Sequence, residues 1–144
     1  MTPRVTLFCI ADEAGFRLLL GKGSDVHEVL HRSADEFDDV SHEFHSSGRG
    51  RAGAAHTSFG HDSSSKAEIE RPRFAKHVVQ ALVAEWAKGT ADRIVLAAGP
   101  KMLGALRDAL PPSLTGHIAV ELAKDLSDVL PKDLLQHMPD LPQV

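Results

Sequence analysis

The fold of this chain is decided by residues 93–110, RIVLAAGPKMLGALRDAL. The five residues after Arg93 are all apolar, which is typical of a strand covered on both faces of a sheet. Gly99 and Pro100 predict a tight turn, because glycine permits backbone conformations closed to other residues and proline suits the first turn of a helix. Apolar side chains then recur at helical spacing, at Met102, Leu103, Leu106 and Leu110. The stretch predicts a buried strand followed by a helix that packs back on the sheet.

Length and charge limit the possibilities for the whole chain. With 144 residues and 42% hydrophobic content, residues 1–144 are long enough for one core, so we expect a single domain. The net charge of -4 gives no reason to expect indiscriminate binding to nucleic acid, so any anion site must be local. The single cysteine, Cys9, lies in an apolar run and predicts a core side chain in a reducing compartment.

Hydrophobic runs also bear on location. No run approaches the roughly twenty apolar residues that a membrane-spanning helix needs. The apolar run at residues 5–11 is short for a signal peptide, and acidic residues follow it where a cleavage site needs small ones. We therefore expect a cytoplasmic protein with no membrane partner.

Three strands are predicted in the first quarter of the chain. Residues 5–11, 16–20 and 26–32 are rich in strand formers and are separated by turn sequences, so they predict an antiparallel meander. Alternation in the third strand predicts that Val26, Glu28 and Leu30 share one face.

Residues 46 to about 66 have a different composition. Serine, glycine, alanine and histidine dominate this segment, which also carries Arg49 and Arg51. A segment with so few large apolar groups cannot offset the entropy of ordering itself, so we expect a long flexible loop. Loops of this length are either functional or simply disordered, and the composition does not choose between these.

A helix is expected from Lys66, with Pro72 near its start and Gly89 at its end. Its apolar stripe consists of Phe74, Val78, Leu82 and Trp86. Three basic side chains would then lie in the first turns, where the helix dipole favours acids. These residues, Arg71, Arg73 and Lys76, indicate an anionic partner near the loop, with ordinary solvated charge as the alternative.

A further strand at residues 117–123 and a short helix from about Pro131 to Met138 complete the chain. The predicted fold class is α/β, with three antiparallel strands followed by an αβαβα succession and a mixed five-stranded sheet. This succession is that of ribonuclease H-like folds.

Two segments carry a family resemblance. Leu96, Pro100, Leu103-Gly104 and Leu106-Arg107 are followed by the segment Lys124-Asp125-Leu126-Ser127 and Pro131. With these motifs the chain resembles the bacterial host-attachment protein family, outside the loop at residues 46–65. The resemblance implies a part in bacterial attachment to host cells and names no mechanism.

A more distant resemblance is to the central domain of archaeal and eukaryotic class I release factors and their bacterial relatives. That domain has three strands, a loop bearing Gly-Gly-Gln and a long helix that begins near Arg-Phe-Ala, which stands here at residues 73–75. The corresponding loop here reads SSGRGRAGAAHTSFG and lacks Gly-Gly-Gln, so peptidyl-tRNA hydrolysis is not carried over. What the resemblance still implies is a Gly/Arg loop beside a basic helix start, which together could contact RNA phosphates or a ribosomal surface.

Catalytic and metal chemistry has weak support. Asp12 ends the first strand, where a ribonuclease H-type hydrolase would place a metal-binding carboxylate, and Glu28, Glu85 and Asp125 are the other acids available. Asp12 is equally well explained as a turn residue. The nine histidines lack zinc-site spacing, so we expect no metal and no cofactor.

One more anion site is possible at the turn after the central strand. Gly99 and Lys101 flank a helix N-terminus at the carboxyl end of that strand, where open α/β sheets often bind ligands. Pro100 removes one N-H donor, so a purely structural turn is the alternative.

Three hypotheses follow. The first is a non-enzymatic protein that contacts structured RNA or the ribosome through Arg49, Arg51, Arg71, Arg73 and Lys76. The second is a metal-dependent hydrolase or nuclease that uses Asp12. The third is a protein-protein interaction module, with another protein or a second copy as its partner.

Overall fold

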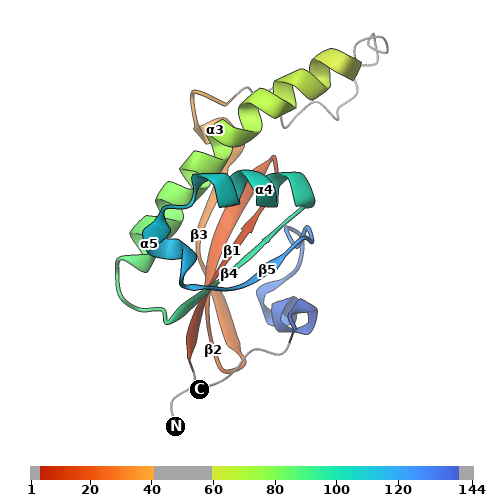
Figure 1. Ribbon diagram of the computed structural model, residues 1–144. Helices are drawn as coiled ribbons and strands as arrows, with labels where there is room; N and C mark the ends of the chain where they lie inside the picture. Colours follow the sequence, from red (N-terminus) through yellow and green to blue (C-terminus); the bar gives the residue numbers. More distant parts are fainter. Residues whose placement is uncertain (1–3, 41–59, 140–144) are drawn as a thin grey trace.

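The computed structural model describes residues 4–40 and 60–139, with side chains from Lys66 onward in the second segment. The elements are β1 (Val5–Ala11), β2 (Gly15–Lys22), β3 (Asp25–Ser33), the 3-10 turn η1 (Ala34–Glu36), α3 (Gly60–Trp86), β4 (Arg93–Ala98), α4 (Pro100–Ala109), α5 (Pro112–Thr115), β5 (Ile118–Leu122) and the 3-10 helix η4 (Pro131–His137). The five strands form one sheet in the order β3-β2-β1-β4-β5 (Figure 1).

The sheet is mixed. β1 pairs with β2 and β2 with β3 in antiparallel fashion, whereas β1 pairs with β4 and β4 with β5 in parallel. The predicted α/β fold with a mixed five-stranded sheet is confirmed.

The two central strands are buried along nearly their whole length. Every residue of β4 is buried, and so is β1 from Thr6 to Ala11. A strand covered on both faces excludes polar side chains from both sides, and this explains the unbroken apolar run of β4. Its one long polar side chain, Arg93, donates from Nε to Thr6 Oγ1 on β1 at 2.8 Å.

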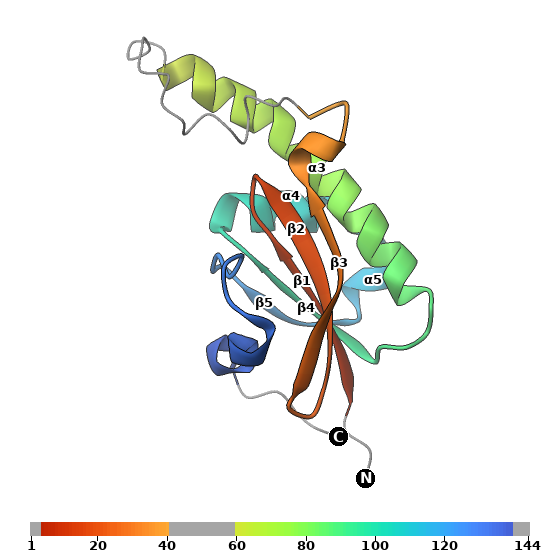
Figure 2. The same ribbon diagram turned by 180° about the vertical axis from the view of Figure 1, so that it is seen from behind.

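Helices cover one face of the sheet, and the C-terminal segment covers the other (Figures 1 and 2). Apolar side chains of α3, α4 and α5 form one core with alternate residues of the strands, among them Leu7, Leu18 and Leu96. Leu126 and Leu134 form a smaller core with the opposite face of β1, β2 and β4. Because both faces are buried, neither face of the central sheet is open to a partner.

Helix α3 lies across the larger core. Its buried side chains Phe74, Val78 and Leu82 follow one another at steps of four and are fully shielded from solvent. Burying each such side chain contributes roughly 1.5–3 kcal/mol, so this stripe fixes which side of the helix faces outward. Gly89 has a φ of 76° and donates its N–H to Trp86 O at 3.0 Å, which ends the helix as predicted.

The start of α3 corrects the sequence prediction. The helix begins at Gly60, so the end of the expected loop, residues 60–66, belongs to the helix, and the rest, residues 46–59, lies outside the described residues. Pro72 therefore lies inside the helix rather than near its start. The proline has no backbone N–H, so it removes one hydrogen bond of the helix.

Three smaller elements also differ from the predictions. Leu18 pairs with Leu30 and Leu19 with Glu28, so Val29 is an extra residue in a bulge. Glu28 and Leu30 consequently face opposite sides of the sheet, because the bulge interrupts the alternation that the sequence implied. The C-terminal helix is a 3-10 helix, and the short α5, which follows Pro111, was not predicted.

Replacing Leu82 by alanine tests how strongly α3 depends on its core contacts. The side chain is fully buried, so we expect Leu82→Ala to lower the free energy of unfolding by about 2–5 kcal/mol. The measurement is urea denaturation followed by circular dichroism. Gln80→Ala is the matched control on the exposed side of the same helix, with an expected change within about 0.5 kcal/mol. Equal effects of the two substitutions would contradict this packing.

Candidate functional site

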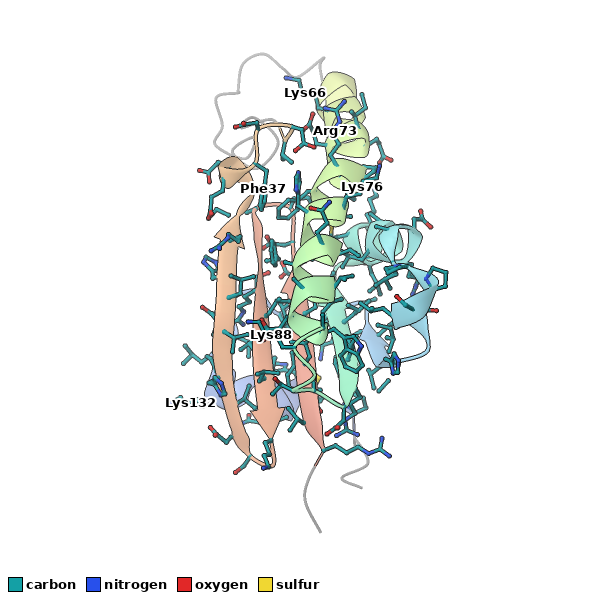
Figure 3. The ribbon with its side chains drawn as sticks, turned by 90° about the vertical axis from the view of Figure 1, so that its left-hand side faces the viewer. Phe37, Lys66, Arg73, Lys76, Lys88 and Lys132 are labelled. Atoms are coloured by element: carbon teal, nitrogen blue, oxygen red, sulfur yellow. The ribbon has the colours of Figure 1, made fainter. Side chains whose placement is uncertain are left out.

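The outward side of α3 carries a line of exposed residues, Lys66, Ile69, Arg73, Lys76 and Gln80, which we call the basic ridge. Steps of three and four residues place these positions on one side of a helix. The line includes three cationic side chains and no carboxylate. Figure 3 shows Lys66, Arg73 and Lys76 along this side of the helix, with Lys88 near its C-terminal end. The ridge is a local concentration of positive charge on a chain of net charge -4.

Carboxylates of α3 lie beside the ridge and not on it. Glu70 Oε2 is 3.3 Å from Arg73 Nη1, and Glu85 Oε1 is 3.0 Å from Lys88 Nζ. In both pairs the glutamate side chain is largely buried while the cation is more than half exposed. Lys76 forms no ion pair or hydrogen bond with any other residue that the structure describes. The ammonium group of Lys76 is therefore available to an external anion.

Arg71 is separate from the ridge. It is only 8% exposed, and its guanidinium binds Glu13 Oε2 at 3.1 Å and Glu68 Oε2 at 3.4 Å. It ties α3 to the turn between β1 and β2, so its charge is already compensated by two carboxylates. The burial of Arg71 does not favour a contact with RNA, and its role as an RNA contact stays a prediction.

The early start of α3 changes the electrostatic argument made from the sequence. Arg71, Arg73 and Lys76 lie about three turns or more after Gly60 and not in the first turns. The unfavourable helix-dipole effect, which falls off within one turn, does not act on them. For Arg73 and Lys76 the evidence for an anionic partner rests on exposure alone, and Arg71 is buried. Arg49 and Arg51 lie outside the described residues.

A clasp formed by Phe37, Asp39 and His77 holds the segment after β3 against α3. The imidazole Nε2–H of His77 donates to Asp39 Oδ1 at 2.6 Å, and the Phe37 ring stacks on the His77 ring with centroids 4.2 Å apart. Arg73 Nη1 also donates to the Asp39 carbonyl oxygen at 3.4 Å. The clasp brings a carboxylate close to the ridge and pairs it with the imidazole. Sequence reasoning missed this group because its partners are 38 residues apart.

The hydrogen bond from His77 is the main reason that the pKa of Asp39 is lowered from its ordinary value, with a further contribution from the charge of His77. A carboxyl group whose pKa is lowered in the folded state stabilises that state above its ordinary pKa. The contribution disappears as the pH falls through the lowered pKa.

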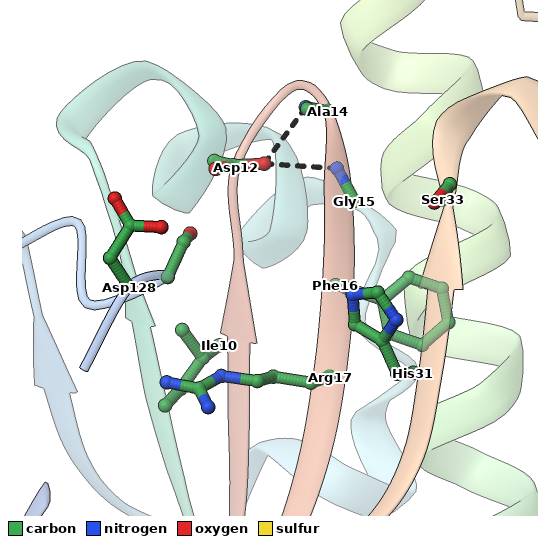
Figure 4. A pocket seen from close by; sticks show the side chains of 10 residues that line it. Ile10, Asp12, Ala14, Gly15, Phe16, Arg17, His31, Ser33 and Asp128 are labelled. Carbon is green, nitrogen blue, oxygen red and sulfur yellow. Dashed lines mark hydrogen bonds between the residues drawn. The ribbon is translucent and has the colours of Figure 1, made fainter. Parts of the chain in front are cut away.

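Asp12 is held in a turn. Its Oδ1 accepts hydrogen bonds from the N–H groups of Ala14 and Gly15 at 2.8 and 2.9 Å (Figure 4). The side chain lines a cavity of about 240 Å³ with Arg17, His31 and Asp128. Within residues 4–40 and 60–139, no three His, Cys, Asp or Glu side chains come together as a metal site would require. The geometry accounts for Asp12 as a turn residue.

Arg17 connects this cavity to the C-terminal segment. Its Nη2 donates to Leu126 O at 2.9 Å and also to Val129 O, and Nη1 lies 3.7 Å from Glu28 Oε1. The side chain thus holds the segment that precedes η4 against the sheet. Its buried Nε has no hydrogen-bond partner among the residues that the structure describes.

The turn at Gly99 and Lys101 lies next to a second cavity. This cavity of about 360 Å³ lies between α3 and α4, and its lining includes Glu68, Arg71, Lys101 and Asp108. Lys101 Nζ lies 3.9 Å from Glu68 Oε2. The carboxylate of Glu68 therefore lies near the ammonium group of Lys101, where an anion would have to bind. Anion binding at this turn stays a prediction.

Two other predictions concern Cys9 and membrane-spanning helices. Cys9 is fully buried, and burial raises the pKa of its thiol to about 12, so it is a core residue as predicted. Among the residues that the structure describes, no helix has the length and apolar character needed to cross a membrane.

Fold and site together define an α/β protein with a mixed five-stranded sheet and an exposed basic helix face. The family model of bacterial archaeo-eukaryotic release factor family 12 matches residues 5–138. The chain therefore belongs to this family. The release-factor part of the resemblance is confirmed, whereas the host-attachment name stays a prediction.

No curated protein matches the chain. Among solved structures, the one described as "Crystal structure of archaeal translation termination factor, aRF1" is similar with a TM-score of 0.48 and 11% sequence identity. The match covers 92% of this chain and 37% of that one, so the present chain spans little more than a third of its length.

The clasp predicts an acid-dependent loss of stability. We expect Asp39→Asn to lower the free energy of unfolding at pH 6, because asparagine cannot form the ionic part of the interaction with His77. The difference from the natural protein should shrink as the pH falls below about 3.9, where the carboxyl group becomes protonated. Denaturation with urea from pH 6 to pH 2.5 measures this difference.

Asp38→Asn is the matched control for this experiment. It removes the same charge one residue away, at an exposed side chain for which the structure records no contact with His77. A difference for Asp39→Asn that stays constant across the pH range, or that Asp38→Asn reproduces, would contradict the clasp.

Proposed function

We propose that this protein is a non-enzymatic, translation-related binding protein that contacts the ribosome or structured RNA through the basic ridge. The observation that carries the proposal is the ridge itself, an exposed line with three cations and no carboxylate on a member of a release-factor family. Phosphate groups are the main anions of RNA, and lysine and arginine are their usual protein contacts. Arg49 and Arg51, outside the described residues, are proposed to add to this surface.

The charge of the rest of the chain supports a local contact. With a net charge of -4, the protein as a whole is repelled by a polyanion, so binding has to take place where the local charge is positive. Lys76 has no described partner, and the guanidinium of Arg73 is about half exposed. A phosphate can approach both groups without displacing a buried ion pair.

The proposal extends to the location, the fold type and the host-attachment role of the protein. The proposed location is the bacterial cytoplasm, where ribosomes are found. The proposed fold type is ribonuclease H-like, on the basis of the predicted succession of strands and helices. For a host-attachment role we propose a protein partner, and Ile69 on the ridge, 55% exposed, is the apolar side chain that would contact it.

Co-sedimentation with ribosomes from a cell lysate tests the proposal. We expect the natural protein to pellet with ribosomes at low salt and the double variant Arg73→Ala/Lys76→Ala to pellet several-fold less, because two phosphate contacts are removed. Lys22→Ala is the control, since Lys22 is an exposed lysine at the end of β2 where no ridge residue lies. Absence of the natural protein from the ribosomal pellet would refute the proposal.

The alternative function is a metal-dependent hydrolase that uses Asp12, and the cavity beside this carboxylate is the observation in its favour. We expect no nuclease or phosphatase activity with magnesium or manganese. We also expect Asp12→Ala to lower the free energy of unfolding by about 1–3 kcal/mol, because two turn N–H groups lose their acceptor.

Asp12→Asn is the control for the structural effect, since its amide oxygen can still accept both hydrogen bonds. A metal-dependent activity that Asp12→Asn abolishes while leaving the stability intact would establish the hydrolase in place of the binding protein.

A further inference from the structure

We infer that the basic ridge recognises the phosphate backbone of double-helical RNA and not a single strand. The inference rests on the proposed function and names the kind of RNA that the surface fits. Three properties of the described residues support it: the shape of the ridge, the burial of the aromatic side chains, and the spacing of the cations along a rigid helix.

The ridge is the solvent-facing side of a helix that packs on the sheet, and it is therefore convex (Figure 3). Proteins that bind single strands usually provide a positively charged groove that follows the backbone. A convex, straight surface fits the wide and shallow minor groove of an RNA helix, where phosphates and 2′-hydroxyl groups are accessible from outside. The shape of α3 favours the duplex.

Single-strand binding also needs exposed aromatic rings on which bases stack. Near the ridge, the Phe37 ring is half-buried, stacked on His77 and packed 6.0 Å from the Phe74 ring. Trp86, near the end of α3, is half-buried with its ring 4.8 Å from that of His117. The remaining described aromatic side chains are buried: Phe8, Phe16 and Phe74. The described part of the chain thus offers cations for phosphates and no free ring for bases.

The cations project from backbone positions that one helix holds in a straight line. Lys66 and Lys76 are ten residues apart, roughly 15 Å along the helix axis, and Arg73 lies between them. A duplex presents its phosphates on an equally rigid frame, so little conformational entropy is lost when the two surfaces meet. A flexible strand would have to be ordered along the ridge without the stacking that normally compensates this cost.

The test uses the full chain and an RNA duplex of about 16 base pairs, the length that double-strand-binding domains span. Fluorescence anisotropy at several salt concentrations compares the duplex with one of its separated strands. We expect tighter binding of the duplex and a salt slope near -3, because about three cations release counterions from phosphates. Lys76→Ala should weaken binding several-fold and reduce the magnitude of the slope by about 1.

Lys22→Ala should leave both the affinity and the slope unchanged, since Lys22 is a lysine of similar exposure at the end of β2, away from the ridge. Equal or tighter binding of the single strand, or a slope that Lys76→Ala does not alter, would overturn the inference. The protein could also co-sediment with ribosomes through the ridge while failing to bind the free duplex. In that case the inference fails and the proposed function stands, with a ribosomal protein as the contact. If the protein neither co-sediments with ribosomes nor binds the duplex, the proposed function and the inference are both refuted.

Discussion

The parallel pairing of β1 with β4 brings two apolar strands together in the middle of the sheet, and the rest of the structure depends on how they are covered. A strand pair of this kind cannot be left open to water on either face. The helices α3, α4 and α5 cover one face, and the segment ending in η4 covers the other. Covering both faces leaves the outside of the helices and the sheet edges as the surfaces available for function.

The position of the ridge follows from this packing. Phe74, Val78 and Leu82 must face the core, so the residues about half a turn away from them must face solvent. Arg73 and Lys76 are among those residues. Their exposure is thus a consequence of where the apolar stripe lies. A shift of the stripe by one residue would turn different side chains outward, and the stability of the core is what prevents that shift.

Much of the fold was predictable because its signals are local. The unbroken apolar run of β4, the Gly99-Pro100 turn and the apolar spacing of α4 each lie within a few consecutive residues. The start of α3 at Gly60 was not predictable in this way, because glycine and serine are weak helix formers and Pro72 resembles a helix start. The bulge at Val29 was equally hidden, since a bulge depends on the pairing with β2 and not on the strand itself.

In the candidate site, too, features with a local sequence signal were predictable and contacts between distant residues were not. Exposed cations on the helix could be inferred from spacing, and Lys76 behaves as that inference requires. Arg71 does not, because its partner Glu13 is 58 residues away and no local pattern indicates the contact. The clasp of Phe37, Asp39 and His77 was missed for the same reason: the interacting side chains come from two segments that the core brings together.

The placement of the carboxylates explains how an acidic chain can carry a basic face. Around α3, Glu68 pairs with Arg71, Glu70 with Arg73 and Glu85 with Lys88, while the carboxylate of Asp39 is paired with His77. The four carboxylates lie beside the ridge, and their pairing reduces the negative potential there. Arg73 is the one ridge residue in these pairs, and Lys76 is left uncovered. A protein with this distribution is attracted to a polyanion in one orientation and repelled in the others, and the field itself then helps to orient the encounter.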